Sequence, residues 1–197
     1  EVLSENELQL ELNGLTSLSN AAAKSLGMHK GMLFLNSLIS LSDTAAEALS
    51  KHKGYLQLGL KSLSNSAGNV ALANKIINQG PRLNLYTLTS LGDAAAIVLS
   101  KHKGFLSLDG LTSLSDAAAK AFSNKEGVLS LDGLTSLSDA AAQALSKCQG
   151  KLFLSNLTSL SDDGAKALAT KKGGEKRMTL PDKLQKKVNK FIKQNRI

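Results

Sequence analysis

Residues 105–127 read FLSLDGLTSLSDAAAKAFSNKEG, and residues 128–150 read VLSLDGLTSLSDAAAQALSKCQG, nearly the same sequence again. The alternating leucines predict a short strand, after which the leucine spacing lengthens into a turn. The Ser-Asp pair that follows is typical of a helix start, because either side chain accepts a hydrogen bond from a first-turn N–H. The alanines after it are the best helix formers. Each unit is therefore predicted to be one strand and one short helix.

The Leu-x-Leu doublet recurs along the chain at spacings of 23, 23, 27, 23, 23, 23 and 26 residues. One unit cannot bury its leucines alone, so we expect seven or eight units to stack around a shared core. The predicted fold is a curved α/β solenoid, with a single parallel sheet on its concave side and short helices on its convex side. The doublets are Leu10/Leu12, Leu33/Leu35, Leu56/Leu58, Leu83/Leu85, Leu106/Leu108, Leu129/Leu131, Leu152/Leu154 and Met178/Leu180.

These residues resemble the leucine-rich repeat family, whose pattern is Leu-x-x-Leu-x-Leu-x-x-(Asn or Cys)-x-x-(Ile or Leu)-(Ser or Thr)-Asp-x-x-(Ala or Gly)-x-x-Leu. The resemblance covers about residues 8 to 180 and is to 23-residue repeats of bacterial type and to the cysteine-containing and ribonuclease-inhibitor-like classes. It implies a leucine-rich repeat solenoid over residues 1–180. The chain departs from the pattern at the Asn or Cys position, which holds Leu38, Leu111, Leu134 and Leu157.

One unit departs from the common length. The stretch from Leu58 to Leu83 is four residues longer than the others and is predicted to carry a longer helix over residues 67–77, followed by Gly80-Pro81. We expect a local bulge or twist there. The corner after each helix ends in glycine, which we expect to form a left-handed helix cap. These corner glycines are Gly31, Gly54, Gly80, Gly104, Gly127, Gly150 and Gly173.

The formal net charge of +8 is concentrated at the C-terminal end. Residues 1–170 contain 14 basic and 14 acidic side chains, whereas residues 171–197 contain 10 basic and two acidic ones, a difference of 8. Residues 181–197 are predicted to form a basic amphipathic helix with Pro181 in its first turn. Its apolar stripe should cap the last unit, and it consists of Leu184, Val188, Phe191 and Ile192.

The basic helix has a second interpretation, in which its lysines attract an anionic membrane surface or phosphate groups. No aromatic residues alternate with these lysines, so nucleic-acid recognition is not expected. The charge polarity also allows the acidic N-terminal end of one copy to meet the basic end of another. The lysines in question are Lys183, Lys186, Lys187, Lys190 and Lys193.

The strand residues that flank the leucines should form an exposed face of the sheet, because successive side chains on a strand point to opposite faces. Five of the seven aromatic residues in the chain fall at these positions. Exposed aromatic side chains together with arginine are typical of protein-binding hot spots. The alternative is that the rings pack across neighbouring strands and stiffen the sheet. The candidate partner-binding residues are Phe34, Tyr55, Arg82, Tyr86, Phe105, Asp109, Asp132 and Phe153.

No catalytic residue, cofactor or metal site is predicted. His29, His52 and His102 fall in one corner column without a carboxylate to complete a metal site, and Cys148 has no evident base near it in sequence. Two stacked aspartates of the strand face could bind calcium, but Asp before Gly is also typical of turns. Because nothing resembles a phosphate loop or a nucleophile with a partnered base, we expect a protein that is not an enzyme.

The leading functional hypothesis is a non-catalytic protein–protein interaction module or scaffold that binds its partner through the concave sheet face. The alternatives are a structural protein that self-associates within a surface assembly, and a protein that binds an anionic surface through its C-terminal helix. The sequence contains no apolar run long enough for a membrane span and no secretory signal pattern, so we expect a soluble chain. Its compartment is left open, a secreted or cell-surface location included.

Overall fold

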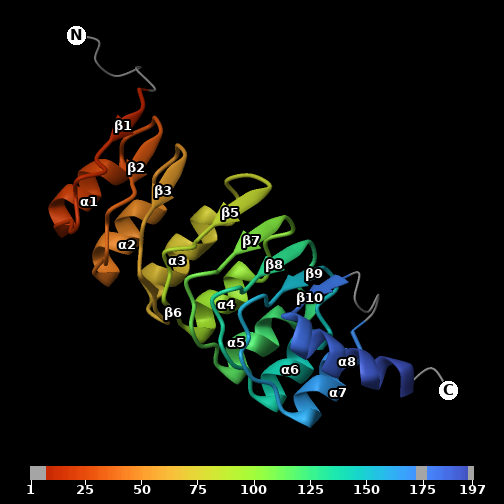
Figure 1. Cartoon of the computed structure of the whole chain (residues 1–197). Helices are drawn as coiled ribbons and strands as arrows, with labels where there is room; N and C mark the ends of the chain where they lie inside the picture. The colour runs from red at the N-terminus through yellow and green to blue at the C-terminus, as the bar shows by residue number, and fades with distance from the viewer. Residues whose placement is uncertain (1–7, 172–176, 195–197) are drawn as a thin grey trace, which may run out of the picture.

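The computed structural model describes residues 8–171 and 177–194, and it is an α/β structure in which strands and helices alternate along the chain (Figure 1). Every pair of strands in the described part is parallel. The strands are β1 (Leu10–Glu11), β2 (Leu33–Leu35), β3 (Leu56–Leu58), β4 (Ser62–Leu63), β5 (Arg82–Asn84), β6 (Ser90–Leu91), β7 (Phe105–Ser107), β8 (Val128–Ser130), β9 (Lys151–Phe153) and β10 (Met178–Thr179).

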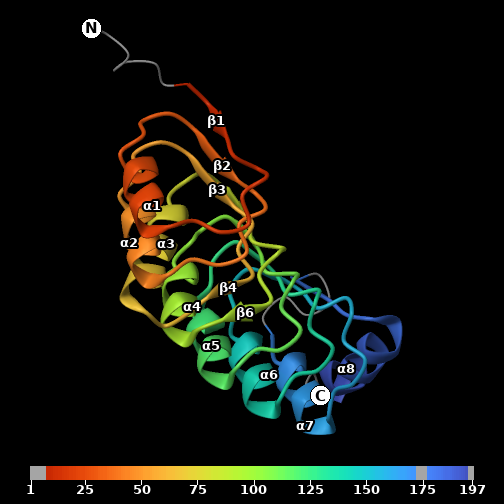
Figure 2. The same ribbon diagram turned by 90° about the vertical axis from the view of Figure 1, so that its left-hand side faces the viewer.

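The helices lie side by side in chain order, and each contacts the next one along the sequence (Figure 2). The predicted longer helix of the irregular unit is confirmed as α3. The helices are α1 (Asn20–Gly27), α2 (Asp43–Ser50), α3 (Ala67–Ile76), α4 (Asp93–Leu99), α5 (Asp116–Ala121), α6 (Asp139–Ser146), α7 (Asp162–Ala169) and α8 (Asp182–Gln194), with a 3₁₀ turn at Phe122–Asn124.

Serine caps start most of the helices, as the Ser-Asp pairs predict. The Ser138 hydroxyl accepts a hydrogen bond from the N–H of Ala141 at 2.9 Å and donates one to the Asp116 carboxylate of the preceding helix. Ser115 repeats this arrangement with Ala118 and Asp93. Each of these serines therefore satisfies a first-turn N–H and also joins two neighbouring helices.

The core lies between the strands and the helices. Both leucines of the doublets in β2, β7, β8 and β9 are fully buried, and so are paired alanines in the middle of α2, α4, α5 and α6. Equivalent residues of neighbouring units are paired across the strands, for example Leu106 with Leu129 and Leu129 with Leu152. Small alanine side chains allow the helices to follow the close spacing of the strands.

The expectation of a single sheet is wrong. The described strands form a three-stranded sheet (β1-β2-β3), a five-stranded sheet (β10-β9-β8-β7-β5) and a separate two-stranded pair (β4-β6). The break falls in the unit with four extra residues. There the Gln79 side chain takes the place of a strand partner, since its amide accepts a hydrogen bond from the Leu56 N–H at 2.6 Å and donates one to the Leu56 carbonyl at 2.8 Å.

The expectation of left-handed caps at all the corner glycines is also wrong. In the described part of the chain only Gly80 (φ 134°) and Gly127 (φ 70°) have positive φ, and Gly173 lies outside the described residues. At other corners, close contact with the main chain of the preceding unit explains why the residue is glycine. A Cβ at Gly150 would lie 1.3 Å from the Gly127 carbonyl oxygen, and one at Gly54 would lie 1.9 Å from the Gly31 oxygen.

The C-terminal helix α8 packs against α7. Leu184 and Val188 of its apolar stripe are buried, and Phe191 and Ile192 are half-buried against the core. The Lys187 amino group donates to the Leu160 carbonyl at 2.7 Å and pairs with Asp162 at 2.8 Å. None of the helices that the structure describes combines the length and the apolar character needed to cross a bilayer.

Candidate partner-binding surface on the strand face

The strand face is the side of the strands opposite the buried leucines, and it carries most of the predicted partner-binding residues. Tyr55 and Tyr86 are 41% and 63% exposed, and Arg82 is exposed as well. Phe34, Phe105 and Phe153 are half-buried on the same face. The aromatic side chains of this face are therefore neither fully covered nor fully free.

Two contacts organise the aromatic residues of the strand face. The rings of Phe34 on β2 and of Tyr55, which directly precedes β3, lie with their centroids 6.0 Å apart at an interplanar angle of 49°. The Arg82 guanidinium lies 5.5 Å from the centroid of the Phe105 ring, from neighbouring strands β5 and β7. Both geometries are within the range of favourable aromatic and cation–π contacts. The face thus contains an aromatic pair on one side of the break in the sheet and a cation–π pair on the other.

Phe153 lies apart from these pairs. Strand β8 separates its strand β9 from β7, and its ring contacts the Lys151 amino group at 4.6 Å. The residues of β8 on this face are Val128, which is half-buried, and Ser130, which is buried. The structure does not bring Phe153 together with the other candidate aromatic residues.

Asp109 and Asp132 form a ladder between units. The Asp109 carboxylate accepts hydrogen bonds from the Ser107 hydroxyl at 2.7 Å, the Ser130 hydroxyl at 2.5 Å and the Asp132 N–H at 3.1 Å. The Asp132 carboxylate accepts one from the Ser155 N–H at 2.6 Å. The carboxylate oxygens of Asp109 and Asp132 therefore accept hydrogen bonds from the next unit along the chain.

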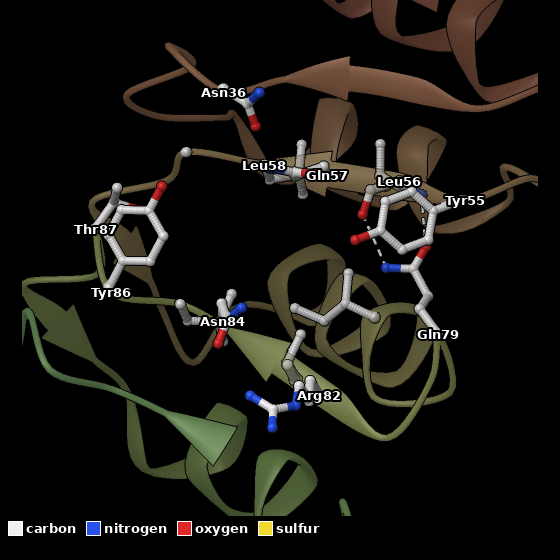
Figure 3. Close-up of a pocket in the computed structure, with 14 residues that line it drawn as sticks. Asn36, Tyr55, Leu56, Gln57, Leu58, Gln79, Arg82, Asn84, Tyr86 and Thr87 are labelled. Atoms are coloured by element: carbon white, nitrogen blue, oxygen red, sulfur yellow. Dashed lines mark hydrogen bonds between the residues drawn. The ribbon is translucent and has the colours of Figure 1, made fainter. Parts of the chain in front are cut away.

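A cavity lies at the break in the sheet, and we call the space between residues 57–59 and residues 82–86 the strand gap (Figure 3). Its volume is about 130 Å³. Figure 3 shows Tyr55 and Tyr86 at opposite ends of the opening, with Asn84 between them. Gln79 closes one end through its two hydrogen bonds to Leu56.

Sequence reasoning missed the strand gap and Gln79. The four extra residues were the signal, because an insertion in a regular repeat must displace main chain somewhere. Nothing in the sequence distinguishes Gln79 from the polar residues that follow other helices. Met32, which directly precedes β2, is a further exposed apolar side chain on this side that is not among the candidate residues.

The corner column of histidines, lysines and the cysteine is buried except for His29, which is half-buried. His29 and His52 stack with centroids 6.0 Å apart, and His102 Nδ1 lies 3.0 Å from the Ile77 carbonyl oxygen. Lys125 is 1% exposed, and its amino group donates to the Gly104 carbonyl at 3.1 Å. Burial lowers the pKa of this amino group.

The same column continues toward the C-terminal end with Cys148 and Lys171. The Cys148 thiol donates to the Lys125 carbonyl at 3.3 Å, and the buried Lys171 amino group donates to the Cys148 carbonyl. These side chains therefore bind main chain of the preceding unit. Within residues 8–171 and 177–194, no three His, Cys, Asp or Glu side chains gather as metal ligands would.

No protein-family model matches the chain, and no curated protein matches it.

Proposed function

We propose that the chain is a solenoid of the leucine-rich repeat type that binds a protein partner, without catalysis, through its strand face. The order of the helices and the pairing of equivalent leucines in successive units support the solenoid. The regular use of serine caps and aspartate ladders between units supports it as well. Repetition of this kind is typical of proteins in which each unit contacts only its neighbours.

The exposure of Tyr55 and Tyr86 on the strand face is the observation that carries the binding function. Tyrosine and arginine are enriched at interface hot spots, where they bury large areas against a partner. Arg82 lies between the two tyrosines in sequence and is exposed on the same face. The aspartates contribute less to this proposal, because their carboxylates already accept hydrogen bonds from the neighbouring turns.

The test replaces Tyr55, Tyr86 and Phe105 together by serine and measures capture of partner proteins from an extract of the cells that make the chain. We expect capture to be lost while the thermal melt followed by circular dichroism stays nearly unchanged. The matched control replaces Met28 and Ile97 by serine. These side chains lie at the end of α1 and on α4 and are 70% and 54% exposed, and this variant should capture the same partner proteins as the unchanged chain. A collapsed melt in the triple variant would instead assign these rings to packing. A captured species identical to the chain itself would indicate self-association.

The lysines of α8 support a second candidate function, attraction to an anionic surface. Lys183, Lys186, Lys190 and Lys193 are exposed, whereas the apolar stripe of the helix is packed against the fold. Binding would therefore be electrostatic and would weaken as salt screens the charges. Sedimentation with phosphatidylserine vesicles at 50 mM and 300 mM salt tests this, with phosphatidylcholine vesicles as the control. Equal binding to both lipids, or none at low salt, would refute it.

A further inference from the structure

At the strand gap, the main-chain N–H and carbonyl of Leu58 in β3 have no partner among the residues that the structure describes. The Leu33 N–H donates to the Tyr55 carbonyl, and the Gly59 N–H donates to the Leu35 carbonyl, so both ends of β3 are bonded to β2. Main-chain groups alternate in direction along a strand of a parallel sheet. The N–H and the carbonyl of Leu58 therefore face away from β2, toward the gap.

Strand β5 presents the opposite edge. The Pro81 carbonyl accepts a hydrogen bond from β7, and the Leu85 N–H donates one to β7. By the same alternation, the N–H and carbonyl groups of Arg82 and Asn84 face β3. Among the described residues no strand pairing joins β3 to β5. Two strand edges thus face each other across a cavity of about 130 Å³.

Gln79 already forms hydrogen bonds with the main chain at this edge of β3. Its side-chain amide offers one carbonyl and one N–H group, the same pair that a peptide bond offers. It uses both on Leu56, the residue of β3 that faces the gap beside Leu58. An amide group therefore occupies one end of the gap. The open part presents main-chain N–H donors and carbonyl acceptors in the same alternation.

We propose that the strand gap takes up a short extended segment of the protein partner, which pairs its main chain with Leu58 on one side and with Asn84 on the other. The proposal rests on the partner-binding function of the strand face and names what the partner inserts. Unpaired strand edges are templates for added strands. A volume of about 130 Å³ accommodates a short piece of main chain and excludes a helix, whose diameter is about 10 Å.

The rim of the strand gap sets the side chains that the segment should carry. Arg82 is the one charged residue among those that line the cavity, so an acidic side chain on the segment is favoured. Tyr55 and Tyr86 stand at the two ends of the opening, where they can cover side chains of the segment that point to the strand face, as the acidic one does (Figure 3). The expected occupant is an extended peptide with an acidic residue between β-branched residues.

The first test measures amide hydrogen exchange in the full-length free protein. We expect the amides of Leu58, Arg82 and Asn84 to exchange at least tenfold faster than those of Leu106 and Leu129, which lie in paired strands. Equal protection at all five positions would show a closed gap and overturn the inference. That result would not bear on the proposed partner binding by the strand face, because the variant with Tyr55, Tyr86 and Phe105 replaced by serine tests that function separately.

The second test adds a capped pentapeptide, acetyl-Thr-Val-Asp-Val-Thr-amide, at millimolar concentration. We expect exchange at Leu58 and Asn84 to slow at least fivefold, and the same peptide with methylated amide nitrogens to have no effect. Asn84→Pro removes a main-chain N–H that faces the gap and should abolish the effect at Leu58, whereas Glu11→Pro at the equivalent position of β1 should retain it. No slowing with the unmethylated peptide, or equal slowing with the methylated one, would overturn the proposal.

Discussion

Replacing Gly150 by alanine should destabilise the fold strongly, because among the described glycines it is the one where an added Cβ would come closest to another unit. The added Cβ would lie 1.3 Å from the Gly127 carbonyl oxygen, whereas ordinary contact begins at 3.4 Å. The two units would have to separate by about 2 Å, which is a large fraction of the strand spacing of about 4.8 Å. The N–H groups of Gln149 and Gly150, which both donate to the Lys125 carbonyl at 3.1 Å, would move with them.

Overpacking of this kind costs about 1–3 kcal/mol, and each buried main-chain group left without a partner adds about 1–3 kcal/mol. We therefore expect Gly150→Ala to lower the free energy of unfolding by at least about 3 kcal/mol. For a chain of this length that corresponds to a fall in Tm of about 6–12 °C. The assay is thermal and urea unfolding followed by circular dichroism. A Cβ at Gly14 has no atom within 4 Å, so Gly14→Ala is the control and should change stability by at most about 1 kcal/mol. A Gly150→Ala protein that melts with the control would refute the close stacking of units.

Burial and the nearby Lys75 lower the pKa of His52 below 6.5. Below about pH 6.5 the unfolded chain therefore binds more protons than the folded one, and the free energy of unfolding should fall as the pH is lowered. The urea midpoint should be lower at pH 5.5 than at pH 7.5, and His52→Phe should make this difference smaller. A difference between the two midpoints that is the same in His52→Phe would contradict the role of His52. Ser138→Ala should cost about 1 kcal/mol through loss of the α6 cap, whereas Ser136→Ala on an exposed turn residue should cost less in the same unfolding assay. Hydrogen bonding from Lys187 lowers the pKa of Asp162, so Lys187→Met should raise that pKa toward its ordinary value in an NMR titration; no change would show that the pair does not form in solution.

The regular part of the fold follows from the sequence because its physical causes are local and repeated. The leucine doublets decide which strand residues are buried, and the serines before the alanines decide where helices begin. The apolar stripe of α8 was equally visible, since Leu184 and Val188 lie one helical turn apart and are both buried. These features depend on residues close together in the chain.

The break in the sheet could not be predicted, because it depends on a contact between residues 23 positions apart in an irregular unit. Gln79 replaces a strand partner of Leu56 only because the longer α3 places it there. The corner glycines were misinterpreted for a similar reason, since the clash at Gly150 comes from the preceding unit and not from its own φ. On the strand face, Asp109 was expected to contact a partner, and its hydrogen bonds to Ser130 and Asp132 cross from one unit to the next.

The most direct test of the proposed binding function places a photo-crosslinking amino acid at Tyr86 on the strand face or at Ile97 on the helix side. After irradiation in an extract of the cells that make the chain, we expect a discrete adduct from position 86 that excess unlabelled chain removes. Position 97 should give none. A competable adduct from position 97, with none from position 86, would contradict the claim that the strand face is the binding surface.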